Sequence, residues 1–190
     1  MRNKNKIKKE NSVGFTLIEV LISIAMVAIL TGATLQISRF SDTQRNLTIE
    51  SDRFLFTIRE MQSYSLSIPN QTAGRVCGFG IYIQSNTVYR SFYTFSKSAS
   101  NDACNKCLGY NVLLADGCQK EMMSAGEDLQ AKGLKFADSN IAKDIFFSAP
   151  YGDVYQNKTA LTSAINFQIE KTTNASEKRI VTINKFGKIE

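Results

Sequence analysis

The chain has 190 residues, a length typical of one domain or of one domain with an appendage. It contains no histidine, which removes the commonest general base and the commonest metal ligand. Its net charge of +6 belongs mostly to the first fourteen residues, because the rest of the chain has 18 basic and 16 acidic side chains. The overall charge is therefore a weak argument for nucleic-acid binding.

Residues 1–14 form a short, polar, basic leader, and an apolar run begins at Phe15. The run reads FTLIEVLISIAMVAIL and continues as TGATLQI, so residues 15–37 are long enough to span a bilayer as a helix. The basic leader would stay on the cytoplasmic side, and the rest of the chain would be translocated. Glu19 interrupts the run, and a charged group at bilayer depth costs roughly 2.5 to 3.5 kcal/mol on insertion scales. This carboxylate therefore needs a partner.

Three kinds of N-terminal segment compete to explain this pattern. A secretory signal peptide would have an uninterrupted apolar core and an A-x-A-like cleavage site, and neither is evident in this run. A plain signal anchor explains the span and leaves Glu19 unexplained. Gly14 followed by FTLIEV resembles the cleavage and methylation motif of type IV pilins and pseudopilins. This resemblance implies that prepilin peptidase, a membrane-embedded aspartyl peptidase, cuts after Gly14 and that Phe15 is then N-methylated.

The resemblance also gives Glu19 a role in assembly. Cleavage would make Glu19 the fifth residue of the mature chain, in the first turn of a helix whose dipole favours an anion. Its partner would be the new α-ammonium of Phe15, on the same subunit or on a neighbour in a helical fibre. The alternative for the isolated subunit is a carboxylate that snorkels to the lipid headgroups. The implied partners are the peptidase/methyltransferase, other pilins or pseudopilins, the inner-membrane assembly platform and membrane lipid.

Residues 38–68 have the pattern of an amphipathic helix that continues the apolar half. Five apolar side chains recur at the spacing of one helix face: Leu47, Phe54, Ile58, Met61 and Ile68. We predict one helix over about residues 15–67 that stops at Pro69-Asn70, with two helices broken near Gly32 or Ser41 as the alternative. Many major pilins have a proline in the second half of this helix, and its absence here favours a minor subunit.

Residues 69–190 have the composition of a β-rich globular domain. Short runs rich in Ile, Val, Phe, Tyr and Thr alternate with clusters of Gly, Asn, Asp and Ser. These runs are GFGIYIQ, NTVYRSFYTFS, YNVLLA, GLKFA, DIFFSA, AINFQIEK and RIVTINKFGKIE. The last two suggest an antiparallel pair, and residues 185–188 have the pattern of a closing turn. We predict an α+β fold in which a long N-terminal helix, apolar in its first half, packs on a C-terminal antiparallel β-sheet domain.

Three further stretches resemble the minor pseudopilins that carry a GspH/FimT-type domain. They are REMQSYSLS at the end of the predicted helix, GFGIYI at the first strand and RIVTINKFGKIE at the C-terminus. This resemblance covers residues 50–95 and 140–190 and implies a pilin-like form of the α+β fold. Residues 97–131 depart from the family pattern, and we predict a cysteine-bearing loop insertion there.

The four cysteines lie close together in the sequence, at Cys77, Cys104, Cys107 and Cys118. In an exported chain they are expected to form two disulfides, for which three connectivities exist. A zinc site is a second interpretation because Cys104 and Cys107 have ligand spacing, but a second close pair and a histidine are missing. A thiol-redox centre is a third, although its motif would begin a helix in a βαβ unit. We predict structural disulfides and no metal site.

Basic residues recur near the C-terminus, and some pilin-like proteins of this class take part in DNA uptake. A basic face could hold phosphates through four residues of the last strand and its turn: Lys178, Arg179, Lys185 and Lys188. Glu170, Glu177 and Glu190 lie among them, and no aromatic ladder accompanies them. A solvated strand edge protected by lysines is the commoner explanation.

No catalytic constellation is present, and we predict no catalytic residue and no cofactor. Gly78-x-Gly80 does not extend to a dinucleotide fingerprint. Asp138, Asp144 and Asp153 fall on predicted turns, where capping and solubility explain them.

The expected function is that of a minor pilin or pseudopilin precursor. It would serve a type IV pilus, a type II secretion pseudopilus or a competence pseudopilus. The chain would cross the cytoplasmic membrane once, with its C-terminal domain outside the cytoplasm, and would join a periplasmic or cell-surface fibre after assembly. The alternative is a DNA-binding, pilin-like component of a DNA-uptake system.

Overall fold

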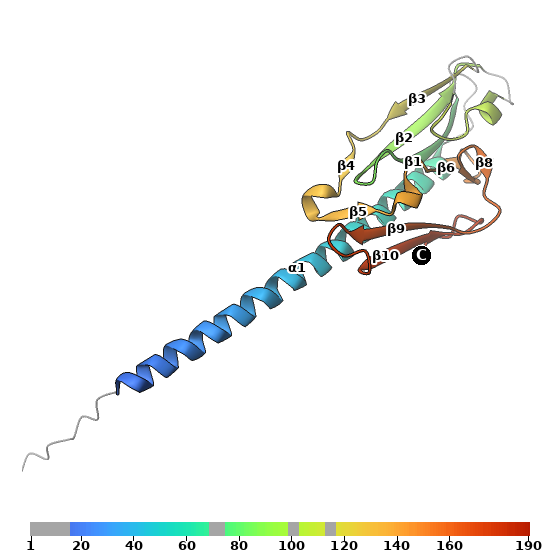
Figure 1. Cartoon of the computed structure of the whole chain (residues 1–190). Coiled ribbons are helices and arrows are strands. Elements are labelled where there is room, and N and C mark those ends of the chain that lie inside the picture. The colour runs from blue at the N-terminus through green and yellow to red at the C-terminus, as the bar shows by residue number, and fades with distance from the viewer. Residues whose placement is uncertain (1–15, 69–74, 99–102, 113–116) are drawn as a thin grey trace, which may run out of the picture. The chain divides into compact units, whose positions relative to one another are not determined.

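The computed structural model describes residues 16–68, 75–98, 103–112 and 117–190 (Figure 1). The chain divides into two compact units, Met1–Asp42 and Thr43–Glu190, and helix α1 (Leu17–Ser67) contributes residues to both. The second unit combines the end of α1 with two antiparallel sheets. The fold is therefore α+β, as the sequence predicts.

The larger sheet has the strand order β3-β2-β1-β6-β7-β8, and the short strand β4 also pairs with β2. All of its described pairings are antiparallel. The strands are β1 (Val76–Ile83), β2 (Val88–Ser96), β3 (Cys118–Met122), β4 (Glu127–Asp128), β6 (Asp144–Ser148), β7 (Val154–Gln156) and β8 (Thr159–Ala160). β1 and β6 lie in its interior, and their side chains are mostly buried.

The smaller sheet has the order β10-β9-β5, with β5 (Leu134–Phe136), β9 (Ile165–Lys171) and β10 (Lys178–Ile183). The predicted antiparallel pair is confirmed, because β10 runs back along β9 from Lys178 opposite Glu170 to Ile183 opposite Ile165. Within the described residues, three short 3-10 helices connect strands: η1 (Ala103–Lys106), η3 (Gln130–Lys132) and η4 (Asp138–Asn140). The predicted closing turn follows β10, where the Asn184 side chain accepts hydrogen bonds from the backbone N–H groups of Phe186 and Lys188.

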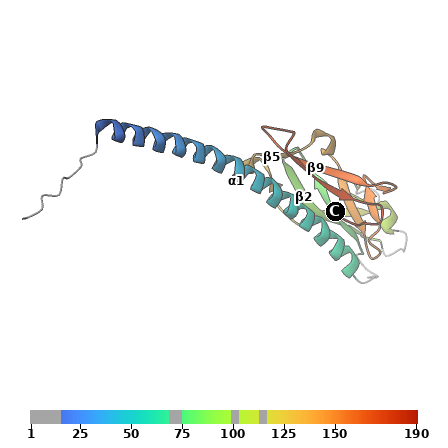
Figure 2. The ribbon, with the colours of Figure 1, turned by 90° about the horizontal axis from the view of Figure 1, so that it is seen from below.

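The second half of α1 packs on both sheets through the helix face that the sequence predicts (Figure 2). Leu47, Phe54, Ile58 and Met61 are each 3% exposed or less, and Ile68 is partly buried. Phe54 lies where the three elements meet. Its ring packs edge-on against Tyr89 of the larger sheet, with 5.0 Å between the ring centroids. It packs in the same way against Phe136 and Phe167 of the smaller sheet, with centroid distances of 5.2 and 5.7 Å.

The segment that we expected to be a loop insertion, residues 97–131, contains the strands β3 and β4. β3 has the sequence CQKEM, which lacks β-branched and aromatic residues, and it forms because its backbone pairs with the outer edge of β2. The strand expected over residues 110–115 is absent from 110–112, and residues 113–116 lie outside the description. The short strands β7 and β8 were also not expected.

Candidate assembly surface

The first turn of α1 is closed by a reciprocal pair of side chains. The backbone N–H of Glu19 donates to the Thr16 hydroxyl at 3.4 Å, and the backbone N–H of Thr16 donates to the Glu19 carboxylate at 2.9 Å. The Thr16 hydroxyl also donates to that carboxylate at 2.9 Å. This arrangement is a capping box, which satisfies N–H groups at the helix start. Glu19 therefore has a local partner, while the predicted cleavage residues Gly14 and Phe15 lie outside the described residues.

From Leu17 to Leu30 the helix exposes apolar side chains in every direction around its axis. Their exposed fractions range from 47% at Val20 to 82% at Leu17. The set is Leu17, Ile18, Val20, Leu21, Ile22, Ile24, Met26, Val27, Ile29 and Leu30. A helix that is apolar all round is a buried helix, either within a larger assembly or within a membrane. We call residues 16–32 the apolar helix segment.

The polar groups of the apolar helix segment are satisfied by the helix itself. The Ser23 hydroxyl donates to the Glu19 carbonyl at 2.7 Å, and the Thr31 hydroxyl donates to the Val27 carbonyl at 2.7 Å. Glu19 is the only ionisable side chain between Thr16 and Gly32. The hydroxyl groups of Ser23 and Thr31 therefore need no external hydrogen-bond partner in an apolar environment.

Among the described residues, no helical stretch is both long enough and apolar enough to cross a membrane. Phe15 and the side chains of residues 33–37, which belong to the predicted span of residues 15–37, lie outside the description.

The four cysteines form two disulfides, Cys77–Cys104 and Cys107–Cys118. Cys77 lies on β1 and Cys118 on β3, the two strands that flank β2 in the larger sheet. Cys104 lies in η1, and Cys107 directly follows it. The two bridges therefore link this segment to β1 on one side of β2 and to β3 on the other. The Thr94 hydroxyl of β2 also donates to the Cys107 carbonyl at 2.7 Å. These pairings choose one of the three connectivities that the sequence leaves open.

The disulfides remove the thiolates that the zinc and thiol-redox interpretations require. All four cysteines lie among the described residues, and none is free. Three of the four cysteines, Cys77, Cys107 and Cys118, are 1% exposed or less. Buried disulfides of this kind are structural cross-links.

The four basic residues considered for DNA contact lie along β10 and the turn that follows it. Lys178 begins β10 and Lys185 lies two residues beyond its end, so the length of the strand, about 20 Å, lies between them along the chain. Arg179 donates to the Thr48 hydroxyl of α1 at 3.3 Å, and Lys188 forms an ion pair with Glu190. The arrangement is that of a strand edge with dispersed cations.

Two charged residues near this edge are buried, which the sequence did not predict. Glu170 accepts a hydrogen bond from the Gln168 side chain at 2.8 Å and forms an ion pair with Lys135 at 3.3 Å. Lys171 forms an ion pair with Glu177. Glu170 and Lys171 are less than 7% exposed. They are buried because β9 is the middle strand of the smaller sheet.

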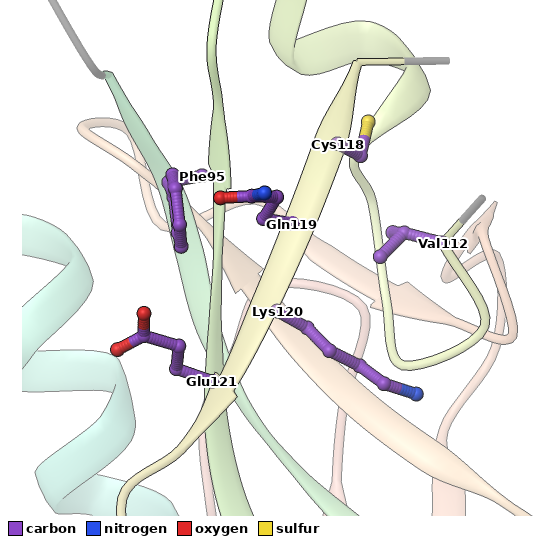
Figure 3. A pocket seen from close by; sticks show the side chains of 6 residues that line it. All are labelled: Phe95, Val112, Cys118, Gln119, Lys120 and Glu121. Carbon is purple, nitrogen blue, oxygen red and sulfur yellow. The ribbon is translucent and has the colours of Figure 1, made fainter. Parts of the chain in front are cut away.

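A cavity of about 460 Å³ lies at the edge strand β3 (Figure 3). Lys120 and Glu121 project to opposite sides of this strand, as consecutive residues of a strand do. The Lys120 ammonium donates to the Tyr110 carbonyl at 3.0 Å and lies 3.5 Å from the centre of the Tyr110 ring. Burial lowers the pKa of Lys120. The two charged residues that line the cavity lie on opposite faces of β3.

Asp144 is a buried residue that the sequence analysis placed on a surface turn. It begins β6 and is 1% exposed. Its carboxylate accepts hydrogen bonds from the backbone N–H groups of Tyr110 and Asn157, both at 2.5 Å. Burial raises the pKa of Asp144, and this effect outweighs the opposite effect of the two hydrogen bonds. The correction follows from strand order, because β6 lies between β1 and β7.

No protein-family model matches this chain, and comparison with the curated proteins and with the solved structures gives no match either.

Proposed function

We propose that the chain is the precursor of a minor pilin or pseudopilin, a structural subunit of a type IV pilus, a type II secretion pseudopilus or a competence pseudopilus. It is anchored in the cytoplasmic membrane by residues 15–37, cut after Gly14, methylated at Phe15 and inserted into a helical fibre through α1. The domain that follows lies outside the cytoplasm.

The observation that carries the proposal is the apolar helix segment with its single carboxylate. Burial of each large apolar side chain is worth roughly 1.5 to 3 kcal/mol, so a helix that leaves ten of them in water is strongly driven to find an apolar environment. Lipid supplies this environment before assembly, and the packed helices of neighbouring subunits supply it afterwards. A subunit that must leave one environment for the other needs a helix that is apolar on all sides.

The position of Glu19 fits the proposed processing. Its carboxylate already accepts a hydrogen bond from the backbone N–H of Thr16, the residue next to Phe15. Cleavage after Gly14 would place a new α-ammonium beside this carboxylate, on the same chain or on a neighbouring subunit. The pair would neutralise both charges away from water, and an unpaired carboxylate there would be costly.

The domain of residues 43–190 fits a location outside the cytoplasm. Two disulfides staple its larger sheet, and disulfides persist in oxidising compartments. The packing of the second half of α1 on antiparallel sheets is consistent with a pilin-like domain. DNA binding has no comparable support, because the four basic residues are dispersed along β10 and its turn.

The N-terminus of the mature chain tests this proposal directly. In cells that possess prepilin peptidase, we expect mass spectrometry to find a chain that begins with N-methylated Phe15. Gly14→Leu should block the cut because its side chain does not fit an extended-backbone cleft, whereas Val13→Ala should be processed normally. A wild-type chain that still begins at Met1 in such cells would contradict the proposal.

A further inference from the structure

A second cavity, of about 300 Å³, lies in the domain between α1, β2 and the connection from β3 to β4. Thr57, Glu60 and Tyr64 line it from one face of α1, at spacings of three and four residues. Tyr89 lines it from β2, and Glu127 lines it from β4, directly opposite Tyr89 in the strand pairing. Two methionines complete its apolar lining.

The Tyr89 hydroxyl is buried next to the Thr57 hydroxyl, and no hydrogen bond of ordinary geometry joins it to a neighbour. Tyr89 is 1% exposed, and its ring is held in the core by edge-on contacts with Phe54 and Phe136. The neighbouring Thr57 hydroxyl donates instead to the Arg53 carbonyl at 3.0 Å. Burial raises the pKa of Tyr89 to about 12, so the hydroxyl stays neutral and keeps an oxygen lone pair to offer. Buried polar groups of this kind normally have a partner.

The charged side chains that line the cavity are acidic and therefore favour a positively charged ligand. Glu60 and Glu127 both line it, and no described lining residue is basic. Arg53 reaches Glu127 at 3.7 Å, but both side chains are about half exposed, and ion pairs of this kind contribute little. The Tyr64 hydroxyl donates to Glu60 at 3.0 Å, which leaves the carboxylate charge in place.

We propose that this cavity binds an alkylammonium group, a primary ammonium on an unbranched apolar stem. An ammonium has three N–H donors, which match the carboxylates of Glu60 and Glu127 and the oxygen of Tyr89. The stem lies against the methionines, whose flexible thioethers adapt to such chains. The volume suits a small ligand or one lysine side chain of a partner polypeptide. The inference does not depend on the proposed assembly role.

The test is a calorimetric titration of the full-length protein in a nonionic maltoside detergent. The probes are pentylamine, 1,5-diaminopentane and Nα-acetyl-lysine-N-methylamide, and pentan-1-ol is the neutral isostere. We expect the amines to bind at least about tenfold more tightly than the alcohol, because their ammonium makes charge-assisted hydrogen bonds. Tighter binding of the lysine derivative would identify a polypeptide as the source, and tighter binding of the diamine would identify a free amine.

Two variants and one control connect this binding to the cavity. Glu60→Gln should weaken pentylamine binding by about tenfold, and Tyr89→Phe should weaken it by about fivefold. Tyr89→Phe should leave the melting temperature unchanged or raise it, because the hydroxyl makes no hydrogen bond of ordinary geometry within the protein. Glu121→Gln changes an exposed acid outside the cavity and should bind like the wild type. Equal affinity for pentylamine and pentan-1-ol, or wild-type affinity in both cavity variants, would overturn the inference.

Discussion

Asp144 illustrates how one side chain can join two segments that are distant in sequence. Its two carboxylate oxygens accept from the backbone N–H groups of Tyr110 and Asn157, and its own N–H donates to the Asn157 side chain at 3.3 Å. Asn157 begins the left-handed turn between β7 and β8, with φ of 49°. A buried acid in this position holds the turn and the segment before β3 against β6.

Replacement of Asp144 by alanine should lower the free energy of unfolding by roughly 2 to 4 kcal/mol, because two partly buried N–H groups lose their acceptor. Urea denaturation followed by circular dichroism measures this change. Asp138→Ala is the matched control, since Asp138 is an exposed acid on η4, and should change the stability by less than about 0.5 kcal/mol.

The difference between wild type and Asp144→Ala should also depend on pH. The pKa of Asp144 in the folded chain is raised above 3.8, so the native state holds the proton more tightly than the unfolded state. The contribution of this group to stability is therefore fully present below pH 3.8 and decreases as the pH rises through the raised pKa. A difference that instead increases over this range would show that hydrogen bonding, and not burial, dominates the site.

The segment between β2 and β3 is positioned by covalent links more than by its own secondary structure. It contains η1, a 3-10 helix of four residues, and its two cysteines reach the strands on either side of β2. Both bridges close short loops, because Cys77 and Cys104 are 27 positions apart in the sequence and Cys107 and Cys118 are 11 positions apart. The longer loop restricts the unfolded chain more.

Separate removal of the two disulfides should therefore have unequal effects. On the chain-entropy model, Cys77→Ala with Cys104→Ala should cost about 3.6 kcal/mol, and Cys107→Ala with Cys118→Ala should cost about 2.8 kcal/mol. Urea unfolding of each double variant against the oxidised wild type measures both values. A larger loss from the shorter loop would show that native-state packing of Cys107 and Cys118, and not loop entropy, decides the effect.

Elements with a strong local pattern were predicted well. The helix face of Leu47, Phe54, Ile58 and Met61 follows from its 3.6-residue period, and the β9–β10 hairpin follows from two runs of β-forming residues around a polar turn. β3 was missed because its residues are polar and gain their strand conformation from pairing with β2. The cavity around Tyr89 was also missed, since three segments far apart in the sequence build it.

The two units of the chain expose very different surfaces. Between Thr43 and Glu190 the large apolar side chains mostly form one closed core, whereas the apolar helix segment leaves its own exposed. A surface of this size marks a site of contact with protein or membrane. We therefore expect changes in the apolar helix segment to alter function while the domain of residues 43–190 still folds.

Substitution of Glu19 by alanine tests this separation in the host cell. We expect the variant to be processed and folded like the wild type but to enter sheared fibres or cross-linked subunit complexes at a level at least about tenfold lower. The reason is that the α-ammonium of the proposed mature chain would lose its carboxylate partner in the fibre. Asp52→Ala, which removes an exposed acid farther along α1, is the control. Immunoblots of the fibre and membrane fractions measure the distribution. Assembly of Glu19→Ala at the wild-type level would contradict the proposed role.

Short-range sequence patterns were sufficient to predict the apolar stretch after Phe15, the amphipathic face of α1, the last hairpin and the presence of disulfides. Each of these features depends on residues that are close together in the sequence. The cysteine partners, the burial of Asp144, Glu170 and Lys171, and the cavity at Tyr89 depend on which strands become neighbours. β1 and β3 flank β2 although β3 lies more than twenty residues beyond it, and no short-range pattern encodes this neighbourhood. Long-range strand order therefore decided the features that only the folded chain reveals.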